Sequence, residues 1–192
     1  KPAVYDQNGW NQMPYLNQGE FYSEFGSFDV TITLPENYVV GATGVLQTEN
    51  EVTFLNELAD KTANRIEKIL ENTENDFPES SSKTKTIRYT AKNVHDFAWF
   101  ADKRFNVLKG DVTLESGKKI DTWAMFTQLE SNLWKDAIGY LNRSVKYYSD
   151  RVGEYPYPHA TAVQSALSAG AGMEYPMITV IGESGTAKLL DQ

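Results

Sequence analysis

The stretch of sequence that decides the fold lies at residues 170–181 and reads Gly-Ala-Gly-Met-Glu-Tyr-Pro-Met-Ile-Thr-Val-Ile. Its first three residues are small, and small residues leave room for a second backbone to approach closely. Glu174 follows them, and the apolar, β-branched run Met177–Ile181 predicts a strand. A strand of this kind offers an extended peptide main-chain hydrogen bonds, and the carboxylate adds a negative charge that an amine can meet. On residue type alone, Glu174 is more typical of a solvated carboxylate at a strand end than of a binding residue.

The overall composition narrows the class of protein. The chain has 192 residues, 41% hydrophobic and 23% charged, which is typical of one ordinary globular domain or two small ones. A formal net charge of −8 argues against a nucleic-acid partner, because nucleic-acid recognition needs a basic face. There is no cysteine, which excludes disulfides and thiolate metal ligands. No apolar run reaches about 18 residues, so we expect no transmembrane segment.

Hydrophobic periodicity predicts a mixed set of elements. Alternation predicts a strand at 28–34, and helical spacing predicts amphipathic helices at 54–72 and from Thr127 to Asp150. The second helix begins with Thr127 and Glu130 at capping-box spacing. Shorter strands are expected at 38–40, 44–46, 86–91, 97–101, 105–108, 112–115, 160–164 and 177–181. We therefore predict an α+β fold, with a β-rich domain at residues 1–125 and the start of a second domain at residues 126–192.

Few residues could carry chemistry by themselves. The two histidines, His95 and His159, are far apart in sequence, and no H-E-x-x-H motif is present. We interpret both as structural or surface residues. Ser165 and Ser168 lack the surroundings of a nucleophile elbow, and residues 170–172 lack the rest of a phosphate-binding loop. We expect no catalytic residue and no metal ligand in this chain.

Several segments resemble the aminopeptidase N family of zinc metallopeptidases, which belong to the gluzincins. The most specific is Gly172-Met173-Glu174, which resembles the family's G-x-M-E-N loop. The others resemble it in order and spacing, at residues 20–35, 96–101 and 155–158. The resemblance spans nearly the whole chain. It implies a curved-sheet N-terminal β-domain followed by the first part of a thermolysin-like α/β catalytic domain.

The resemblance also implies roles for particular residues. In such enzymes the loop backbone pairs with the peptide substrate like an added strand, and the motif's glutamate binds the free α-amine. Carried over, the substrate-binding residues are Ala171, Gly172, Met173, Glu174 and Tyr175, with Glu174 as the amine anchor. Two positions depart from the family pattern, because Tyr175 stands where Asn is usual and Ala171 where Gly is frequent. These departures leave the substrate preference open.

The same resemblance implies that the zinc ligands and the general base follow Gln192, with residues 187–192 as the first turn of their helix. We therefore expect zinc in the parent protein, none in this fragment, and no activity from the fragment alone. A non-catalytic scaffold or peptide-binding relative is the alternative. A β-sandwich unrelated to peptidases is a third, and it places residues 172–174 in a surface turn.

Two further expectations follow from reading the chain as a fragment. The missing helix leaves apolar side chains such as Ile178 and Ile181 exposed, and exposed apolar surface promotes self-association. Many relatives are exported, so we expect a periplasmic, cell-envelope or secreted location.

Overall fold

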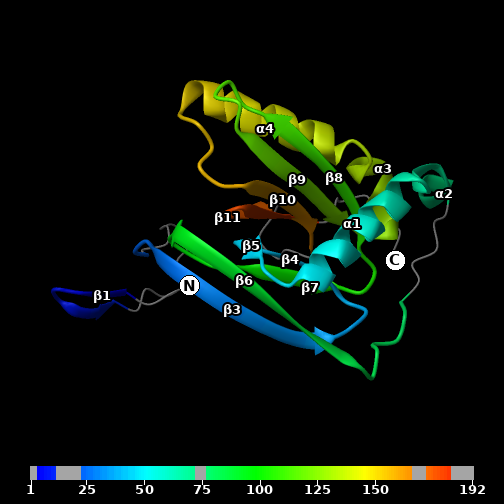
Figure 1. Ribbon diagram of the computed structural model, residues 1–192, viewed down its shortest axis with the longest axis horizontal. Coiled ribbons are helices and arrows are strands. Elements are labelled where there is room, and N and C mark those ends of the chain that lie inside the picture. Colours follow the sequence, from blue (N-terminus) through cyan, green and yellow to red (C-terminus); the bar gives the residue numbers. More distant parts are fainter. Residues whose placement is uncertain (1–3, 12–22, 72–76, 166–171, 183–192) are drawn as a thin grey trace.

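The computed structural model describes residues 4–11, 23–71, 77–165 and 172–182. The strands, in chain order, are β1 (Val4–Asp6), β2 (Gly9–Asn11), β3 (Gly26–Pro35), β4 (Val39–Ala42), β5 (Val45–Leu46), β6 (Thr84–Val94), β7 (Trp99–Asp102), β8 (Asn106–Thr113), β9 (Lys119–Phe126), β10 (His159–Gln164), β11 (Gly172–Tyr175) and β12 (Ile178–Ile181). The helices are α1 (Glu49–Ala63), α2 (Ile66–Glu71), the 3-10 helix η1 (Gln128–Glu130), α3 (Ser131–Trp134) and α4 (Ala137–Arg151). The predicted α+β class is confirmed (Figure 1).

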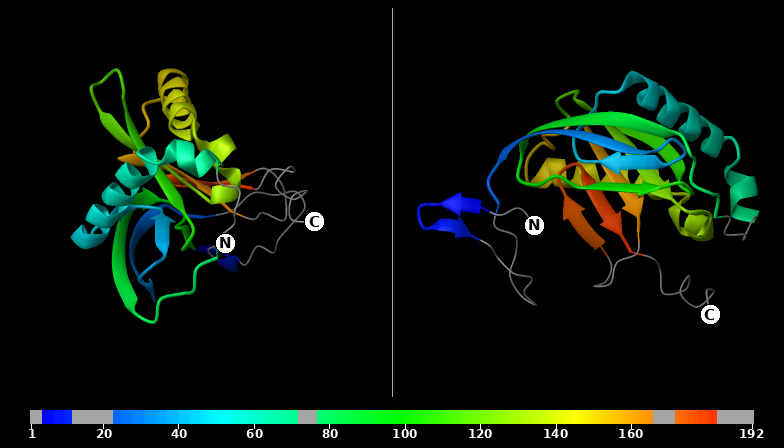
Figure 2. Two further views of the ribbon diagram at one scale, coloured as in Figure 1. Left: turned by 90° about the vertical axis from the view of Figure 1, so that its right-hand side faces the viewer. Right: turned by 90° about the horizontal axis from the view of Figure 1, so that it is seen from below.

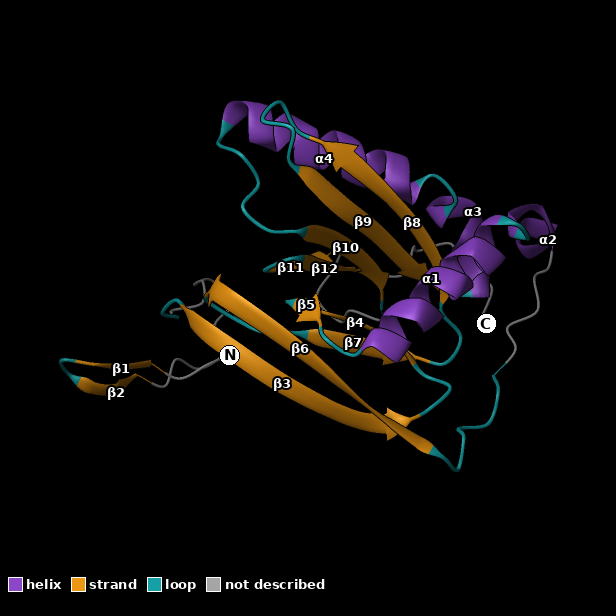
Figure 3. Ribbon diagram, viewed as in Figure 1, coloured by secondary structure: helices purple, strands orange, loops and turns teal. Residues whose placement is uncertain are grey.

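The described strands form four sheets (Figure 3), two of which are the two-stranded pairs β1-β2 and β4-β7. A five-stranded sheet has the order β11-β12-β10-β9-β8, and a three-stranded sheet has the order β3-β6-β5. In the larger sheet β9, β10 and β12 run parallel, while β8 and β11 are antiparallel to their neighbours. The parallel pair β9–β10 needs a crossover connection, and α4 lies within that connection.

The predicted strand at 28–34 is confirmed as β3, which pairs with β6 along its whole length. Alternate residues of the pair face inward, so Ile32 and Leu34 meet Ile87 and Tyr89 in one apolar cluster. Val40 of β4 completes this cluster and has no exposed surface. The three-stranded sheet therefore has its own apolar core, separate from the clusters that pack on the five-stranded sheet.

The five-stranded sheet is covered on both faces. On one face Leu55 of α1 packs with Met125 and Val163, and on the other Trp134 of α3 packs with Ala124 and Ala162. The assignment to opposite faces follows from the alternation of neighbouring residues along β9 and β10. Figure 2 shows α1 and α4 on opposite sides of the β8–β9 hairpin. We call the two sides the α1 face and the α4 face.

Two details of the sequence prediction change. The helix predicted at 54–72 is two helices, because Arg65 bonds back to Thr62 in a tighter turn between α1 and α2. The strands predicted at 105–108 and 112–115 are one strand, β8. Gly110 lies inside it, and a Cβ there would collide with Ile138 of α4. Glycine thus keeps the strand continuous while the helix packs closely on it.

The predicted capping box at Thr127 is wrong. Thr127 has no side-chain cap bond, and its backbone N–H and hydroxyl instead donate to Oε1 of Gln164, at 2.6 and 3.0 Å. Both residues are buried at the ends of the neighbouring strands β9 and β10. A tertiary partner has replaced the local one that the sequence suggested.

The two-domain division at residues 125 and 126 stays a prediction. The sheet itself continues across that point, because β9 ends at Phe126 and pairs with both β8 and β10. β7, which pairs with β4, ends at Asp102, and β8, the first strand of the five-stranded sheet in chain order, begins at Asn106. In the described parts of the chain, no helix is long and apolar enough to cross a membrane.

Candidate functional site

The segment at the predicted site forms an antiparallel hairpin, β11–β12. Glu174 pairs with Thr179 and Tyr175 pairs with Ile178, so Pro176 and Met177 form a two-residue turn. Met177 has a φ of 66°, the left-handed conformation that the second central position of such a turn requires. β11 lies at one end of the sheet order, and within the described ranges its outer edge has no strand partner.

Alternation along β11 sends its side chains to opposite faces of the sheet. Tyr175 lies on the α1 face, where it packs against the main core cluster, with its ring centroid 6.0 Å from that of Phe100. Glu174 is exposed and shares the α4 face with Thr179, its partner across the hairpin. The predicted substrate-binding residues are therefore divided, with Met173 and Tyr175 on one face and Gly172 and Glu174 on the other.

Glu174 lines a pocket of about 290 Å³ on the α4 face. Thr179 forms part of its floor, and Tyr155 and Tyr157 form part of its wall. A second pocket of about 450 Å³ continues along α3 and α4, and the two share Leu141 and Thr179. We call this pair of pockets the α4-face groove.

The groove exists because α4 covers only part of its face. α4 packs on β8, β9 and β10, whereas no described helix packs to a similar extent on β11 or β12. Ile181 is 40% exposed in this region, but Ile178 is only 2% exposed, since it points to the α1 face. The expectation that both isoleucines are exposed is thus right for Ile181 and wrong for Ile178.

The two tyrosines beside Glu174 are held by backbone hydrogen bonds. The Tyr155 hydroxyl donates to the carbonyl of His159 at 2.9 Å, and the Tyr157 hydroxyl donates to the carbonyl of Asn93 at 2.9 Å. Burial raises the pKa of Tyr155 above its ordinary value. Both hydroxyls are therefore fixed in position, and the two rings give the groove its shape. The Glu174 carboxylate is the charged group that this part of the groove presents.

His159 connects the two halves of the molecule. Its Nε2 donates to the carbonyl of Gly44 at 2.7 Å, and its Nδ1 lies 3.0 Å from the hydroxyl of Thr161. Because a carbonyl only accepts, the proton is on Nε2, and Nδ1 accepts from Thr161. Burial keeps the pKa of His159 below its usual range, against the opposing influence of Gly44 and Asp121. The interpretation of His159 as a structural residue is supported by these contacts.

The other candidate residues are less informative. His95 lines the groove and packs edge-on against Phe25, with ring centroids 5.6 Å apart. In the described ranges, no three His, Asp or Glu side chains converge as a metal site would require. Ala171, Ser168 and the expected helix start at 187–192 lie outside the described residues. Residues 172–174 form strand β11, so the surface turn expected for an unrelated β-sandwich is wrong.

Sequence reasoning missed part of the groove. Residues 155–158 were noted for their resemblance to the family but not as part of a site, and Thr179 was predicted only as part of the strand at 177–181. Two aromatic residues separated by prolines are a signal for a shaped surface, since proline fixes the backbone and tyrosine supplies area with a polar end. Their position beside Glu174 depends on the pairing of β10 with β12, which no local pattern contains.

Neither a protein-family model nor a curated protein matches the sequence. Solved structures do match. The M1 zinc metallopeptidase from Deinococcus radiodurans aligns over 88% of this chain, with a TM-score of 0.53 and 14% identity. A mutant of that enzyme bound to a Tyr-Ser-Ala substrate aligns over 87%, with a TM-score of 0.56 and 14% identity. A two-domain M1 zinc metallopeptidase mutant bound to L-tryptophan aligns over 87%, with a TM-score of 0.57 and 14% identity.

At this level of identity the likeness is one of fold. The resemblance to zinc metallopeptidases of the aminopeptidase N type is confirmed in that sense, and it extends over nearly the whole chain, as predicted. The chain spans only 33% of the length of each of these proteins.

Proposed function

We propose that this chain is part of a zinc-dependent aminopeptidase and that it supplies the site for the substrate's N-terminus. One observation carries the proposal. Glu174 is exposed on an edge strand and lines the groove that lies beside α4. The chain has the fold of proteins named M1 zinc metallopeptidases, one of which was solved with a tripeptide substrate bound. Membership of that family and an aminopeptidase activity are inferences from these observations.

The edge strand accounts for binding of the peptide backbone. β11 is four residues long and is paired on one side only in the described structure. Its outer N–H and C=O groups can hydrogen-bond an extended peptide, as in other cases of strand addition. A short edge strand limits this pairing to a few residues of the peptide. The expected ligand is therefore the end of a peptide and not a long internal segment.

The carboxylate accounts for the choice of end. A peptide's free α-amine carries a positive charge near neutral pH, and Glu174 is the acidic side chain that lines the pocket beside β11. Charge-assisted hydrogen bonds to an ammonium are stronger than neutral ones. Glu174 and the edge strand together would select a free N-terminus and hold it against the sheet.

Zinc cannot be placed on the residues described. These contain no cluster of three His, Asp or Glu, and Glu174 alone is not a zinc site. We infer that the ligands in the parent protein come from residues outside the described ranges. Zinc bound there would supply an activated water for hydrolysis. What this chain contributes is orientation of the substrate.

Tyr175 departs from the usual motif, and most of its side chain faces away from Glu174. Tyr175 lines the first pocket of the α4-face groove, but its ring packs into the core on the α1 face, close to Phe100. We infer that the substitution acts on the rigidity of β11 rather than on contacts with the peptide. Met173 lies on the same face and is half-buried there.

A non-catalytic peptide-binding relative is the second candidate. The groove and the edge strand belong to this chain and need no metal, and a fold can persist after its chemistry is lost. This candidate predicts peptide binding by the parent protein without turnover. Both candidates assign the binding of the peptide's amine to Glu174. They differ in whether the parent protein binds zinc.

The experiment that separates the two is a zinc and activity assay on the longer parent protein. We expect one zinc per chain and hydrolysis of an aminoacyl-anilide that stops on addition of a chelator and returns with zinc. The 192-residue chain alone should show no turnover. Absence of zinc and of turnover in the parent would exclude the aminopeptidase and leave the peptide-binding relative.

A further inference from the structure

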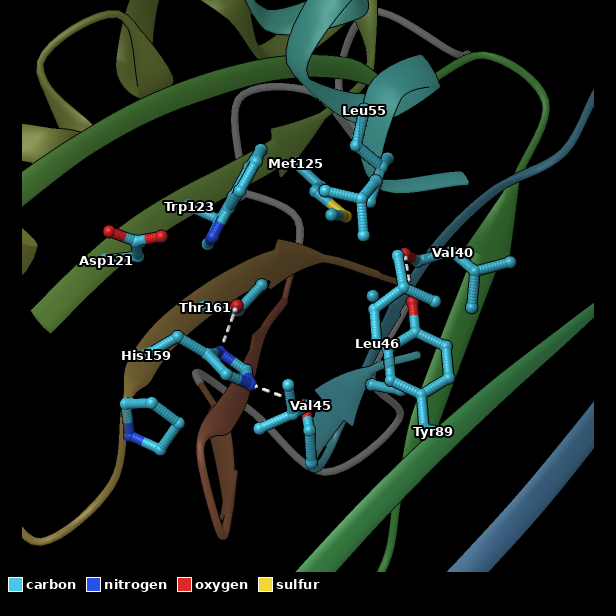
Figure 4. A pocket seen from close by; sticks show the side chains of 15 residues that line it. Val40, Val45, Leu46, Leu55, Tyr89, Asp121, Trp123, Met125, His159 and Thr161 are labelled. Carbon is cyan, nitrogen blue, oxygen red and sulfur yellow. Dashed lines mark hydrogen bonds between the residues drawn. The ribbon is translucent and has the colours of Figure 1, made fainter. Parts of the chain in front are cut away.

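A third pocket, of about 240 Å³, lies on the α1 face of the large sheet (Figure 4). It is formed where three parts of the molecule meet: the β4–β5 segment, α1, and the strands β9 and β10. Glu174 is on the opposite face, so this pocket is separate from the proposed peptide site and does not depend on it. Figure 4 shows Trp123, Asp121 and His159 on one side of the pocket, and Leu55, Val40 and Tyr89 on the other.

Most of the pocket wall is apolar. The aliphatic lining residues are Val40, Val45, Leu46, Val52, Leu55 and Met125. Gly41 and Gly44 add backbone surface to the lining. A cavity of this kind favours an apolar ligand body, because burial of apolar surface is favourable and few polar groups must be desolvated.

Two polar groups in the wall already have partners. The Tyr89 hydroxyl donates to the carbonyl of Val40 at 3.2 Å. Both ring nitrogens of His159 are used, one by Gly44 and the other by Thr161. These hydrogen bonds fix the positions of Tyr89 and His159 in the pocket wall. The Tyr89 hydroxyl proton and both His159 nitrogens are therefore already bonded within the protein.

Asp121 and Trp123 differ, because they form a cation site that the protein fills with one of its own side chains. The Lys109 ammonium lies 4.7 Å from the centre of the Trp123 ring and 3.8 Å from the Asp121 carboxylate. Its hydrogen bond at 2.9 Å goes to Asn56 instead. The Asp121 side chain is 45% exposed, and a long ion contact at such a site contributes little free energy. The ion contact between Lys109 and Asp121 therefore costs little to break, and a ligand ammonium can pair with Asp121 while Lys109 keeps its hydrogen bond to Asn56.

We propose that this pocket binds a small organic amine, with its ammonium between Asp121 and Trp123 and a compact aromatic or branched aliphatic body in the apolar cavity. A carboxylate beside an aromatic face is the arrangement that attracts a desolvated cation. Pockets for drug-sized ligands usually have volumes of about 300–1,000 Å³, and this pocket is smaller. Its size restricts the apolar part of the ligand to a single ring or a short branched chain. The net charge of −8 also disfavours an anion.

The direct test compares two probes of the same shape. Binding of 2-phenylethylamine and of its neutral analogue 2-phenylethanol to the 192-residue chain is measured by calorimetry at pH 7. We expect the amine to bind with a dissociation constant at least about tenfold lower than the alcohol, since a hydrogen bond to a charged group contributes more than a neutral one. Equal affinities, or no binding of the amine, would overturn the proposal.

Matched variants locate the site. Asp121→Asn should raise the dissociation constant of the amine about tenfold and leave that of the alcohol unchanged. Asp150→Asn is its control, because Asp150 has a similar exposure of 38% and an ion pair with Lys146 on α4. Val52→Phe should abolish binding of both probes by filling the cavity, since Val52 is 39% exposed and the helix can accept the larger side chain.

The control for the filling variant is Val152→Phe, at an 82% exposed position after α4. Circular dichroism of each variant checks that the fold is retained. If the amine still binds to folded Val52→Phe, or if both asparagine variants lose affinity equally, the site is elsewhere and the proposal is wrong. The preference for amine over alcohol in the unmodified chain tests the proposal even where a variant fails to fold.

Discussion

The imidazole of His159 donates a 2.7 Å hydrogen bond to the carbonyl of Gly44, a residue 115 positions earlier in the chain. This contact joins β10 of the large sheet to the segment between β4 and β5. Both residues line the pocket on the α1 face for which we propose an amine ligand. His159 is also the first residue of β10, so the contact fixes the start of that strand.

The pKa of His159 predicts a loss of stability on mild acidification. Burial lowers the pKa in the folded state, so between the unfolded value of about 6.5 and the folded value the unfolded chain binds the additional proton. The free energy of unfolding should therefore fall as the pH drops below about 6.5, by at most about 1.4 kcal/mol per pH unit. Urea unfolding at pH 7.5 and 5.5 measures this loss.

His159→Gln should remove most of that difference between the two pH values, because the amide carries no titratable proton. His95→Gln is the control and should retain it. If both variants keep the full pH dependence, another group is responsible.

Met177 predicts an unusual order of two small substitutions. Its φ of 66° is costly for any residue with a Cβ, by about 1–2 kcal/mol, yet its side chain is buried and only 5% exposed. Both Met177→Ala and Met177→Gly should destabilise, by about 2–4 kcal/mol for alanine. Glycine should be the milder of the two, whereas in ordinary strands it is the worse. Thermal unfolding of the two variants gives the order, and alanine above glycine would show that the turn is not strained.

Gly44 should tolerate no side chain. Its φ is +91°, and a Cβ there would lie 2.6 Å from the backbone oxygen of Thr90. Gly44→Ala should therefore cost at least about 2 kcal/mol in unfolding free energy, from backbone strain and the clash together. Gly117→Ala is a matched control, because its φ is +86° and no atom lies within 4 Å of the added Cβ. Equal costs for the two would mean that the contact with Thr90 is absent.

The α4-face groove should promote self-association of the 192-residue chain. Leu133 and Tyr140 are 58% and 55% exposed, and they line the groove together with Ile181. Apolar surface of this kind favours contact between copies. Sedimentation velocity at increasing concentration should show a dimer, and Leu133→Glu should shift it to monomer. A chain that stays monomeric at all concentrations would contradict this expectation.

Local patterns predicted the elements better than their arrangement. The alternation at 28–34 predicted β3, and the helical spacing after Thr127 predicted the region of α4, because both signals lie within a few turns of chain. Thr127 shows where such reasoning fails. Its capping box was plausible, but its partner is Gln164, and only the parallel pairing of β9 with β10 brings the two together.

The candidate site shows the same division. The motif around Glu174 indicated an amine anchor in a loop ahead of a strand, whereas the structure has Glu174 exposed on a strand of its own, β11. Which face Glu174 occupies, and that Tyr175 turns away into the core, depends on the register of β11 with β12. No local sequence pattern indicates the pocket on the α1 face, because its lining residues Asp121 and Val52 come from segments far apart in the sequence.

The most direct test of the central claim is the kinetics of Glu174→Gln in the longer parent protein, with an aminoacyl-anilide as substrate. Loss of the ion pair with the substrate amine should lower kcat/KM about a hundredfold while zinc content stays the same. Glu115→Gln, in the exposed turn after β8, is the control and should match the unmodified enzyme. If Glu174→Gln hydrolyses the substrate as fast as Glu115→Gln does, Glu174 is not the amine anchor and the account is wrong.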